Sequence, residues 1–317
     1  MNAEEDLGAN LLIIMALLEH SQDEGVRIWK SFENEISKKS RFFPNTEKIC
    51  AAIDFCLSET SYSMPKGERI YRARIIHENE LSAKTRATLD KLPGRKHEDI
   101  FGTERSTSYS KMLRRMNRDA SRMVAGNSAD LYEELRNNSY WGFSAQKSGA
   151  PPSEKASAGR INSAGISFLY AAESVHTAIV ESRPVIGQTV SVAEIEIKRL
   201  LRLFDFTVDL VDQVGSKAHM YTIFNEISRQ FTMPNHYGDA AYLPTQYISE
   251  LLRSKGFDGI RYHSSLHEGG INIVLFDTEK DEKKRRNYTI GHSAIHFVKG
   301  IEIAVEQLLP LREHATG

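Results

Sequence analysis

The chain has 317 residues, of which 40% are hydrophobic and 26% are charged, and its formal net charge is −1. This composition is typical of a folded globular protein that buries a core without disulfide or metal staples. The near-neutral charge argues against direct nucleic-acid binding, because phosphate neutralisation needs a basic surface. A small anionic ligand remains compatible, since it needs only one or two well-placed arginines.

The cysteines, the histidines and one apolar run predict the redox compartment, the absence of a metal site and the location of the protein. Cys50 and Cys56 match neither a zinc nor a redox spacing, so we expect free thiols in a reducing compartment. The eleven histidines are scattered, and we expect no metal site. The apolar run at 11–18 is shorter than the roughly 20 residues that span a bilayer, and acidic residues precede it. We interpret it as a core helix and expect a cytoplasmic protein without membrane contact.

The first region, residues 1–65, is predicted to be helical. Apolar residues recur at helical spacing through 26–32 and again through 49–57. Residues 61–67 contain Pro65 and Gly67 and are interpreted as a linker. No residue type in this region indicates chemistry, so we expect a docking element or a homo-oligomer interface formed by the N-terminal helices.

The second region, residues 66–280, mixes strand and helix patterns and predicts an α+β domain. Short apolar or alternating runs predict strands at 69–76, 168–172, 189–197, 259–262 and 271–276. Ser174 is a typical N-cap for a helix over 175–181. Pro244 is expected to open another helix, which Gly256 closes.

Two further segments lie within or beyond this region. The long polar stretch 76–148 is interpreted as an insertion, and the Gly- and Pro-rich stretch 141–158 as a loop. Residues 281–317 are expected to form an extension with a strand at 287–298 and an amphipathic segment at 301–309. The element order is not the regular βαβ alternation of a doubly wound fold, and no dinucleotide fingerprint, P-loop or nucleophile elbow is present.

Three residues in one segment could carry chemistry. Arg160 ends the flexible loop, and its planar donor fork matches phosphate geometry. Tyr170 lies in the next strand, and Glu181 ends the following helix among small and apolar residues. From spacing alone, Glu181 is either an ion-pair partner or an electrostatic catalyst, and ion pairs are the commoner case. Ser264, Ser265 and Asn272 follow or begin strands, where they suit a ligand-contacting loop or an ordinary turn equally well.

Four blocks of the sequence, taken in order, resemble a known family. They are YRAR at 71–74, the segment GRINSAGISFLYAAESVHTAIVE at 159–181, TQYISELLRSKGFDGIRYHSS at 245–265 and NIVLF at 272–276. Together they are similar to the RES domain, the toxin of RES–Xre toxin–antitoxin pairs. The resemblance covers residues 69–277. The insertion and the N-terminal region depart from compact members of the family.

The resemblance implies a fold similar to ADP-ribosyltransferase toxins, with a bent, split sheet and flanking helices. It also implies NAD⁺ as the substrate, degraded by hydrolysis or phosphorolysis with growth arrest as the result. The expected partner is an Xre-type helix-turn-helix antitoxin. Three alternatives remain open: a protein ADP-ribosyltransferase, a non-catalytic module that binds NAD⁺ or ADP-ribose, and a helical interaction protein.

The same resemblance implies roles for individual residues. Arg72 and Arg160 are expected to grip the phosphates, and Glu181 to stabilise a cationic ribose. The remaining expected site residues are Tyr71 and Tyr170 against nicotinamide or ribose, Ser264 on ribose or phosphate with Ser265 as its rival, and Asn162 and Asn272 as supporting polar contacts. Arg69 and Arg74 compete with Arg72 for its role. Arg74 shares a strand face with Arg72, whereas Tyr71 lies on the other. Tyr71 and Arg72 can therefore enter one cleft only at a bulge or a strand end.

Overall fold

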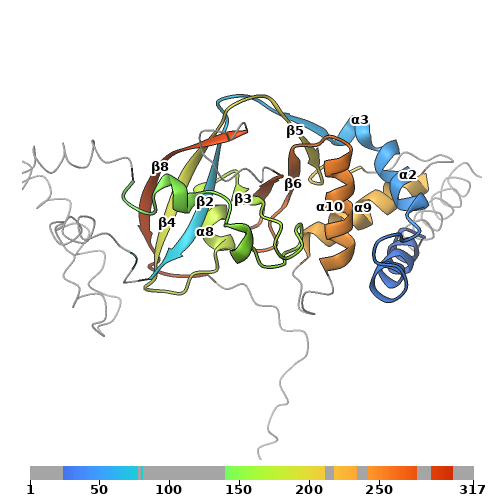
Figure 1. The fold of residues 1–317 in the computed structure, drawn as a ribbon, viewed down its shortest axis with the longest axis horizontal. Coiled ribbons are helices and arrows are strands. Elements are labelled where there is room, and N and C mark those ends of the chain that lie inside the picture. Colours follow the sequence, from blue (N-terminus) through green and yellow to red (C-terminus); the bar gives the residue numbers. More distant parts are fainter. Residues whose placement is uncertain are drawn as a thin grey trace, which may run out of the picture.

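The computed structural model describes residues 24–77, 80, 140–210, 218–233, 242–276 and 287–302. The apolar run at 11–18, most of the 76–148 insertion and most of the 301–309 segment lie outside these ranges. Within them the chain is α+β, as predicted, with one mixed sheet and helices on its flanks (Figure 1).

The sheet has eight strands in the spatial order β1-β5-β6-β7-β3-β2-β4-β8. Their bounds are β1 Ser61–Met64, β2 Arg69–Ile76, β3 Leu169–Ala172, β4 Thr189–Ile197, β5 Leu201–Asp205, β6 Gly259–His263, β7 Ile271–Leu275 and β8 Tyr288–Phe297. All neighbours are antiparallel except β5 and β6, which are parallel. The strands predicted at 69–76, 168–172, 189–197, 259–262, 271–276 and 287–298 are all present.

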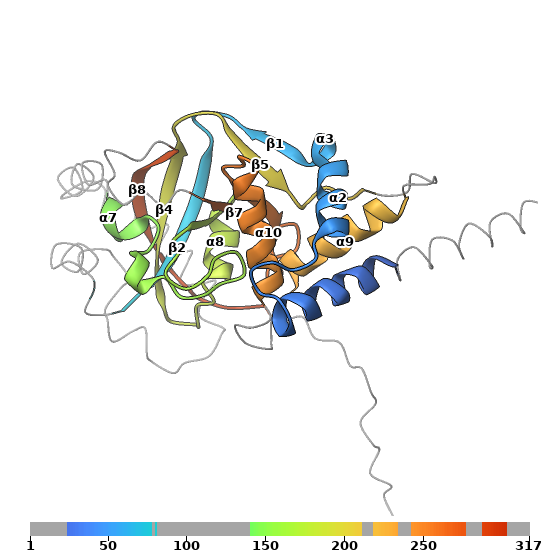
Figure 2. The same cartoon turned by 45° about the vertical axis from the view of Figure 1, so that its right-hand side comes forward.

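The sheet is split between β2 and β3. These two strands share a single registered pair, Tyr71 with Ala172, whereas β2 pairs with β4 along its whole length. Helix α8 (Val175–Glu181) packs against both β2 and β3 and so bridges the junction (Figure 2). Because strands that separate leave a gap beside their edges, this junction is where a pocket can form. The expected likeness to ADP-ribosyltransferases stays a prediction, although the split agrees with it.

Local sequence signals explain the two helices that border this junction. The side chain of Ser174 accepts a hydrogen bond from the backbone N–H of Thr177, which caps α8 as predicted. Helix α10 (Leu243–Ser254) carries Pro244 in its first turn, where the missing N–H costs nothing. Gly256 follows it with φ +84°, a left-handed conformation that glycine adopts without strain.

The helices of the N-terminal region share a core with the C-terminal half of the chain. The helix over 24–38 and α2 (Glu47–Phe55) contribute Trp29, Phe32 and Ile49 to a buried cluster that also contains Phe204 and Phe224. The short α3 (Leu57–Thr60) follows α2 directly. A Cβ on Gly25 would lie 2.6 Å from the carbonyl oxygen of Thr222, so the first helix touches the backbone of α9 (Ala218–Thr232).

Four elements, the strands β1, β5 and β8 and the helix α9, differ from expectation or were not predicted. The linker expected at 61–67 is wrong for Ser61–Met64, which pairs with β5 as strand β1. Its four residues, SYSM, do alternate polar and apolar side chains, but so short a run next to Pro65 and Gly67 is equally typical of a linker. Strand β5 and helix α9 were not predicted, although the apolar spacing of Ile223, Ile227 and Phe231 is a helical signal. Strand β8, expected in a C-terminal extension, pairs with β4 as the edge of the sheet.

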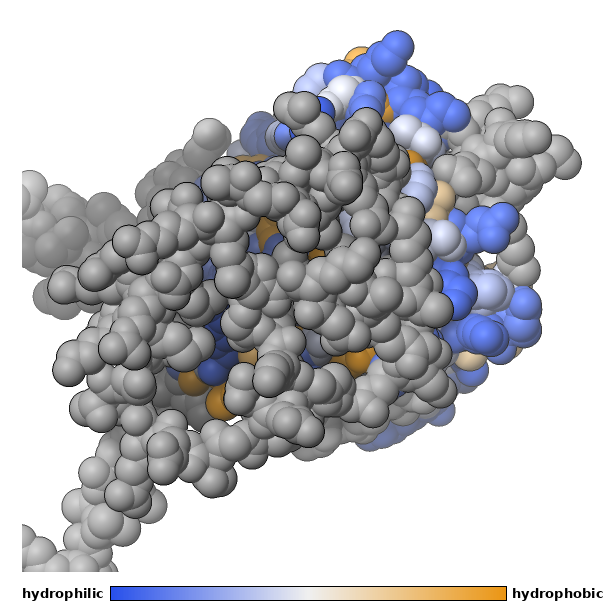
Figure 3. Space-filling model, turned by 90° about the vertical axis from the view of Figure 1, so that its left-hand side faces the viewer, coloured by the Kyte–Doolittle hydropathy of each residue, from blue (hydrophilic) through white to orange (hydrophobic). Residues whose placement is uncertain are grey.

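In the part of the chain that the structure describes, no helix has both the length and the apolar character needed to cross a membrane. Hydrophilic side chains predominate on the described surface visible in Figure 3. Cys50 and Cys56 are free thiols, and burial raises the pKa of Cys56 to about 12.

Candidate active site

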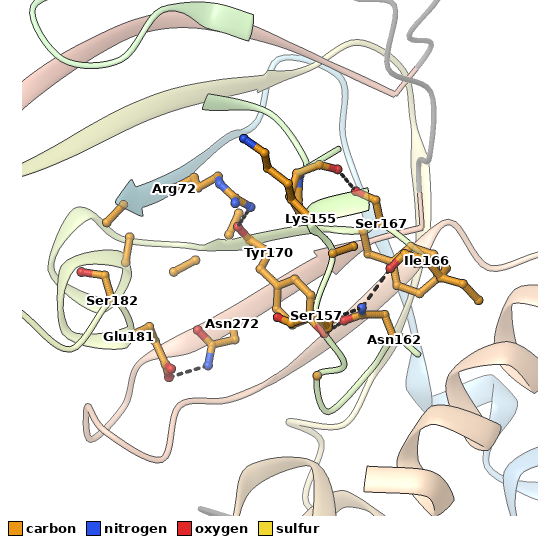
Figure 4. Close-up of a pocket in the computed structure, with 18 of the residues that line it drawn as sticks. Arg72, Lys155, Ser157, Asn162, Ile166, Ser167, Tyr170, Glu181, Ser182 and Asn272 are labelled. Atoms are coloured by element: carbon orange, nitrogen blue, oxygen red, sulfur yellow. Dashed lines mark hydrogen bonds between the residues drawn. The ribbon is translucent and has the colours of Figure 1, made fainter. Parts of the chain in front are cut away.

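A pocket of about 360 Å³ lies at the junction between β2 and β3 (Figure 4). Its walls come from β2, β3, α8, β7 and the loop that precedes β3. The expected site residues that line it are Tyr71, Arg72, Asn162, Tyr170, Glu181 and Asn272. The fold therefore brings together, in one pocket, six of the nine residues that the sequence singled out.

Glu181 lies at the C-terminal end of α8 and turns its carboxylate toward the pocket wall formed by β7. Its Oε1 accepts a hydrogen bond from the Ser264 hydroxyl at 2.6 Å and another from the Asn272 amide at 2.7 Å. Among the described residues, Oε2 has no partner. The helix dipole disfavours a negative charge at the C-terminal end of a helix. The two hydrogen-bond donors offset this effect and hold the carboxylate in place.

Ser264 acts on Glu181 from behind the pocket, and it does not line the cavity. Its oxygen accepts hydrogen bonds from the backbone N–H groups of Leu266, at 3.1 Å, and His267, at 3.0 Å. Because these donors occupy the oxygen lone pairs, the hydroxyl proton points to Glu181. Ser265, the rival of Ser264, has no such contact with the carboxylate.

Arg72 places a positive charge in the same pocket. One guanidinium nitrogen donates to the carbonyl oxygen of Tyr170 at 3.2 Å, while its buried Nε has no hydrogen-bond partner. No described carboxylate forms an ion pair with it, and burial, with a smaller contribution from the nearby charge of Arg74, lowers the pKa of Arg72 to about 10. A desolvated cation without a counter-ion is a site prepared for an anionic ligand.

Arg74, the competitor of Arg72, points elsewhere. It donates to the carbonyl oxygen of Lys147 and lies over the ring of Phe143 at 4.9 Å. Tyr71 and Arg72 nevertheless line one pocket, because the cavity opens at the edge of β2 where β3 leaves it. Lys155, which the sequence analysis did not select, lines the pocket near Arg72 and adds a second cation (Figure 4).

Tyr170 and Asn162 form a rigid wall of the pocket. The Tyr170 hydroxyl donates to Asn162 Oδ1 at 2.6 Å, and burial raises the pKa of this tyrosine, which keeps it neutral. The Asn162 amide donates to three backbone carbonyls, those of Ser157, Ser163 and Ile166. Asn162 is only 4% exposed, so its polar groups shape the loop and leave Tyr170 to present its ring to a ligand.

Arg160 is placed differently from the sequence expectation. Its guanidinium donates to the backbone carbonyls of Phe231 and Met233 and does not line the pocket. These carbonyls lie at the C-terminal end of α9, where helices leave acceptors without intrahelical donors. Because α9 was not predicted, the carbonyls at its end could not be foreseen as partners of this arginine. A phosphate contact for Arg160 stays a prediction that this geometry does not favour.

In the described ranges, no three histidine, cysteine, aspartate or glutamate side chains cluster as metal ligands would. The pocket instead joins an oriented carboxylate, a buried guanidinium and an aromatic wall. Such a set can hold a ligand that carries an anionic group and a centre that becomes positive.

No curated protein matched the chain. The family model described as the RES domain matches residues 131–295, which is more than half of the chain. The matched range contains Glu181, Tyr170, Ser264 and Asn272, and it ends within β8. The chain therefore belongs to the RES domain family.

Proposed function

We propose that this protein cleaves the nicotinamide–ribose bond of NAD⁺. The single observation that carries the proposal is the presence, in one pocket, of the oriented Glu181 carboxylate and of the Arg72 guanidinium, whose buried Nε has no hydrogen-bond partner and which forms no ion pair with a described carboxylate. Membership in the RES domain family supports a toxin-like function in general and is consistent with an enzyme that acts on NAD⁺. Growth arrest through NAD⁺ depletion is the cellular outcome we propose.

The chemistry needs electrostatic stabilisation more than proton transfer. When the bond breaks, its electron pair moves to the nicotinamide nitrogen, which becomes neutral, and positive charge develops on the ribose. Glu181 would lie against that charge, with Oε2 free to face it while Ser264 and Asn272 hold Oε1. Preorganised charges of this kind stabilise a transition state because they need no rearrangement during the reaction.

Anchoring of the substrate would fall to the cations and the aromatic wall. Arg72 would bind the pyrophosphate with the help of Lys155, since charge-assisted bonds to phosphate replace the counter-ion that Arg72 lacks. Tyr170, and Tyr71 from β2, would pack against the nicotinamide or ribose. The reaction products identify the acceptor of the ADP-ribose: free ADP-ribose indicates water, and ADP-ribose phosphate indicates phosphate.

Product analysis of the purified protein tests this function. NAD⁺ is incubated with and without inorganic phosphate, and nicotinamide, ADP-ribose and ADP-ribose phosphate are separated. The expected result is nicotinamide release that Glu181→Gln lowers on the order of 10²–10³-fold. Label from NAD⁺ found on a protein would redirect the proposal to a protein ADP-ribosyltransferase. Tight NAD⁺ binding without nicotinamide release would identify a binding module instead.

We also propose a helix-turn-helix antitoxin of Xre type as the regulatory partner, as the family resemblance implies. Its test is co-expression of this chain with the product of a neighbouring reading frame that encodes such a protein. Restored growth together with co-purification supports the pairing. Growth arrest that persists, with no complex recovered, counts against it.

A further inference from the structure

The carboxylate that the proposed function places at the reacting centre is held through a loop, and that loop is attached to α8 at a second point. The loop over 264–270 connects β6 and β7 and carries Ser264 at its start. It closes on itself through hydrogen bonds from Ser264 N to Gly270 O, at 2.8 Å, and from Gly270 N to His267 O, at 2.9 Å. A displacement of any part of this loop would therefore move the Ser264 hydroxyl.

The second attachment joins His267 to Thr177. The Thr177 hydroxyl lies 2.9 Å from His267 Nδ1 and 2.7 Å from the hydroxyl of Ser174, the N-cap of α8. Thr177 is 1% exposed, so the contact is shielded from water. The ring of His176 packs edge-on against that of His267, with centroids 4.6 Å apart.

Both attachments fall on one face of α8. Thr177 and Glu181 are four residues apart, and side chains at this spacing are neighbours along a helix. The loop thus contacts α8 one turn above Glu181 through His267 and at Glu181 itself through Ser264. Two contacts on one face fix the rotation of the helix relative to the loop, whereas one contact would leave a hinge.

The backbone at Gly270 is shaped around this contact. A Cβ added there would lie 2.6 Å from His267 Nδ1 and 2.9 Å from Thr177 Oγ1. Because glycine has no side chain, Gly270 lets the backbone pass close to the hydrogen bond between Thr177 and His267 just before β7 begins. This close approach ties the position of β7, which supplies Asn272, to the same pair of residues.

We propose that Thr177 and His267 are positioning residues that hold the Glu181 carboxylate in its reactive orientation. They act through the loop over 264–270: His267 anchors it to α8, while Ser264 at its start and Asn272 in β7, just after its end, bind Oε1. This inference rests on the proposed function, in which Glu181 stabilises the cationic ribose. Misplacement of such a group by about 1 Å lowers a rate on the order of 10²-fold without touching substrate binding.

Matched variants of Thr177 test the proposal. Thr177→Val removes the hydroxyl at nearly constant volume, and Thr177→Ser keeps the hydroxyl. Thr177→Val is expected to lower kcat for nicotinamide release by roughly two- to tenfold, the equivalent of one lost hydrogen bond, with KM within about twofold of wild type. Thr177→Ser is expected to retain most of the rate. If both variants lose activity equally, or if neither does, the hydroxyl has no positioning role and the proposal fails.

The attachment of the 264–270 loop to α8 through Thr177 and His267 is called the clamp. Hydrogen exchange tests the clamp independently of turnover. In Thr177→Val the amides of the 264–270 peptide should exchange about two- to tenfold faster, the equivalent of one lost hydrogen bond, and in Thr177→Ser they should not. Unchanged exchange in Thr177→Val overturns the proposal even if the rate falls. If the wild-type protein releases no nicotinamide, the proposed function fails, and exchange alone still decides whether the clamp exists.

A second pair of variants covers the case in which Thr177→Val does not fold. His267→Asn keeps a polar group that can reach the Thr177 hydroxyl, whereas His267→Ala removes it. The proposal expects the alanine variant to lose kcat and loop protection and the asparagine variant to recover at least part of both. Equal behaviour of the two variants would show that His267 acts only by filling space.

Discussion

The Ser264 hydroxyl and the Glu181 carboxylate, 83 residues apart in the chain, meet at 2.6 Å at the base of the pocket. The serine donates its only proton in this contact, because its oxygen already accepts two backbone N–H groups. Because those lone pairs are occupied and Ser264 does not line the pocket, the oxygen is poorly placed to attack a substrate, and the role of the serine is to orient the charge of Glu181. This relationship separates the two adjacent serines, which the sequence left as rivals.

Removal of the Glu181 charge is expected to lower kcat for nicotinamide release on the order of 10²–10³-fold, as for other preorganised groups. Glu181→Gln is the appropriate variant because it keeps the shape of the side chain. Glu268→Gln, on the exposed part of the adjacent loop, is the control and should retain full activity. Steady-state nicotinamide release measures both, and a near-normal rate in Glu181→Gln would refute the assignment.

The two serines are expected to differ sharply. Ser264→Ala removes a charge-assisted hydrogen bond to Glu181 and should lower kcat by roughly tenfold, the equivalent of about 1.5 kcal/mol. Ser265→Ala should stay near the wild-type rate. Circular dichroism verifies folding of both variants. The reverse ranking would mean that the loop takes another conformation in solution.

Arg72 is expected to show opposite effects on stability and on ligand binding. Arg72→Met removes a desolvated cation that has no ion-pair partner among the described residues, so the ligand-free protein should gain stability and its Tm should rise by a few degrees. The same variant should lose the Tm increase that ADP-ribose or NAD⁺ produces in the wild type. Arg74→Met is the control on the same strand and should keep the ligand effect, because Arg74 points to Lys147. Thermal unfolding with and without ligand measures all of these effects.

The charge of Arg72 also predicts a pH dependence of ligand binding. Its pKa is lowered to about 10 by burial, so the guanidinium is protonated below that pH and loses its charge as the pH rises through it. Binding of an anionic ligand should therefore weaken above about pH 10. A titration of ADP-ribose affinity between pH 8 and about 10.5, with Arg72→Lys for comparison, follows this change. A flat profile would show that the phosphates are held by other groups.

Arg160 is expected to contribute to stability rather than to substrate binding. Arg160→Ala leaves the carbonyls of Phe231 and Met233 without their donor, and the Tm should fall by an amount equivalent to about 1–3 kcal/mol. KM for NAD⁺ should change less than about threefold. Thermal unfolding and steady-state kinetics distinguish the outcomes. A large rise in KM with unchanged Tm would restore the phosphate contact that the sequence suggested.

Several elements could be predicted from sequence because their signals are local. Strand β2 was predicted from its alternating pattern and β4 from its strand-like run, Ser174 capped α8, and Pro244 and Gly256 bounded α10. Strand β1 could not be recognised because four residues are stabilised by pairing with β5, which lies 140 residues away. The residue types of the site, Arg, Tyr, Glu and Ser, were likewise visible in the four blocks.

The sequence by itself thus determined the α+β class, most strands and the residues from which a site could be built. Only the tertiary structure decided which of them converge. The pocket lies beside β2 because the sheet splits at Tyr71. Arg160 binds carbonyls at the end of α9 and does not line the pocket. The conformation of the loop over 264–270 places Ser264, and not Ser265, against Glu181. The reason is physical: propensity and periodicity act over a few residues, whereas the partners of a side chain are set by packing between distant segments.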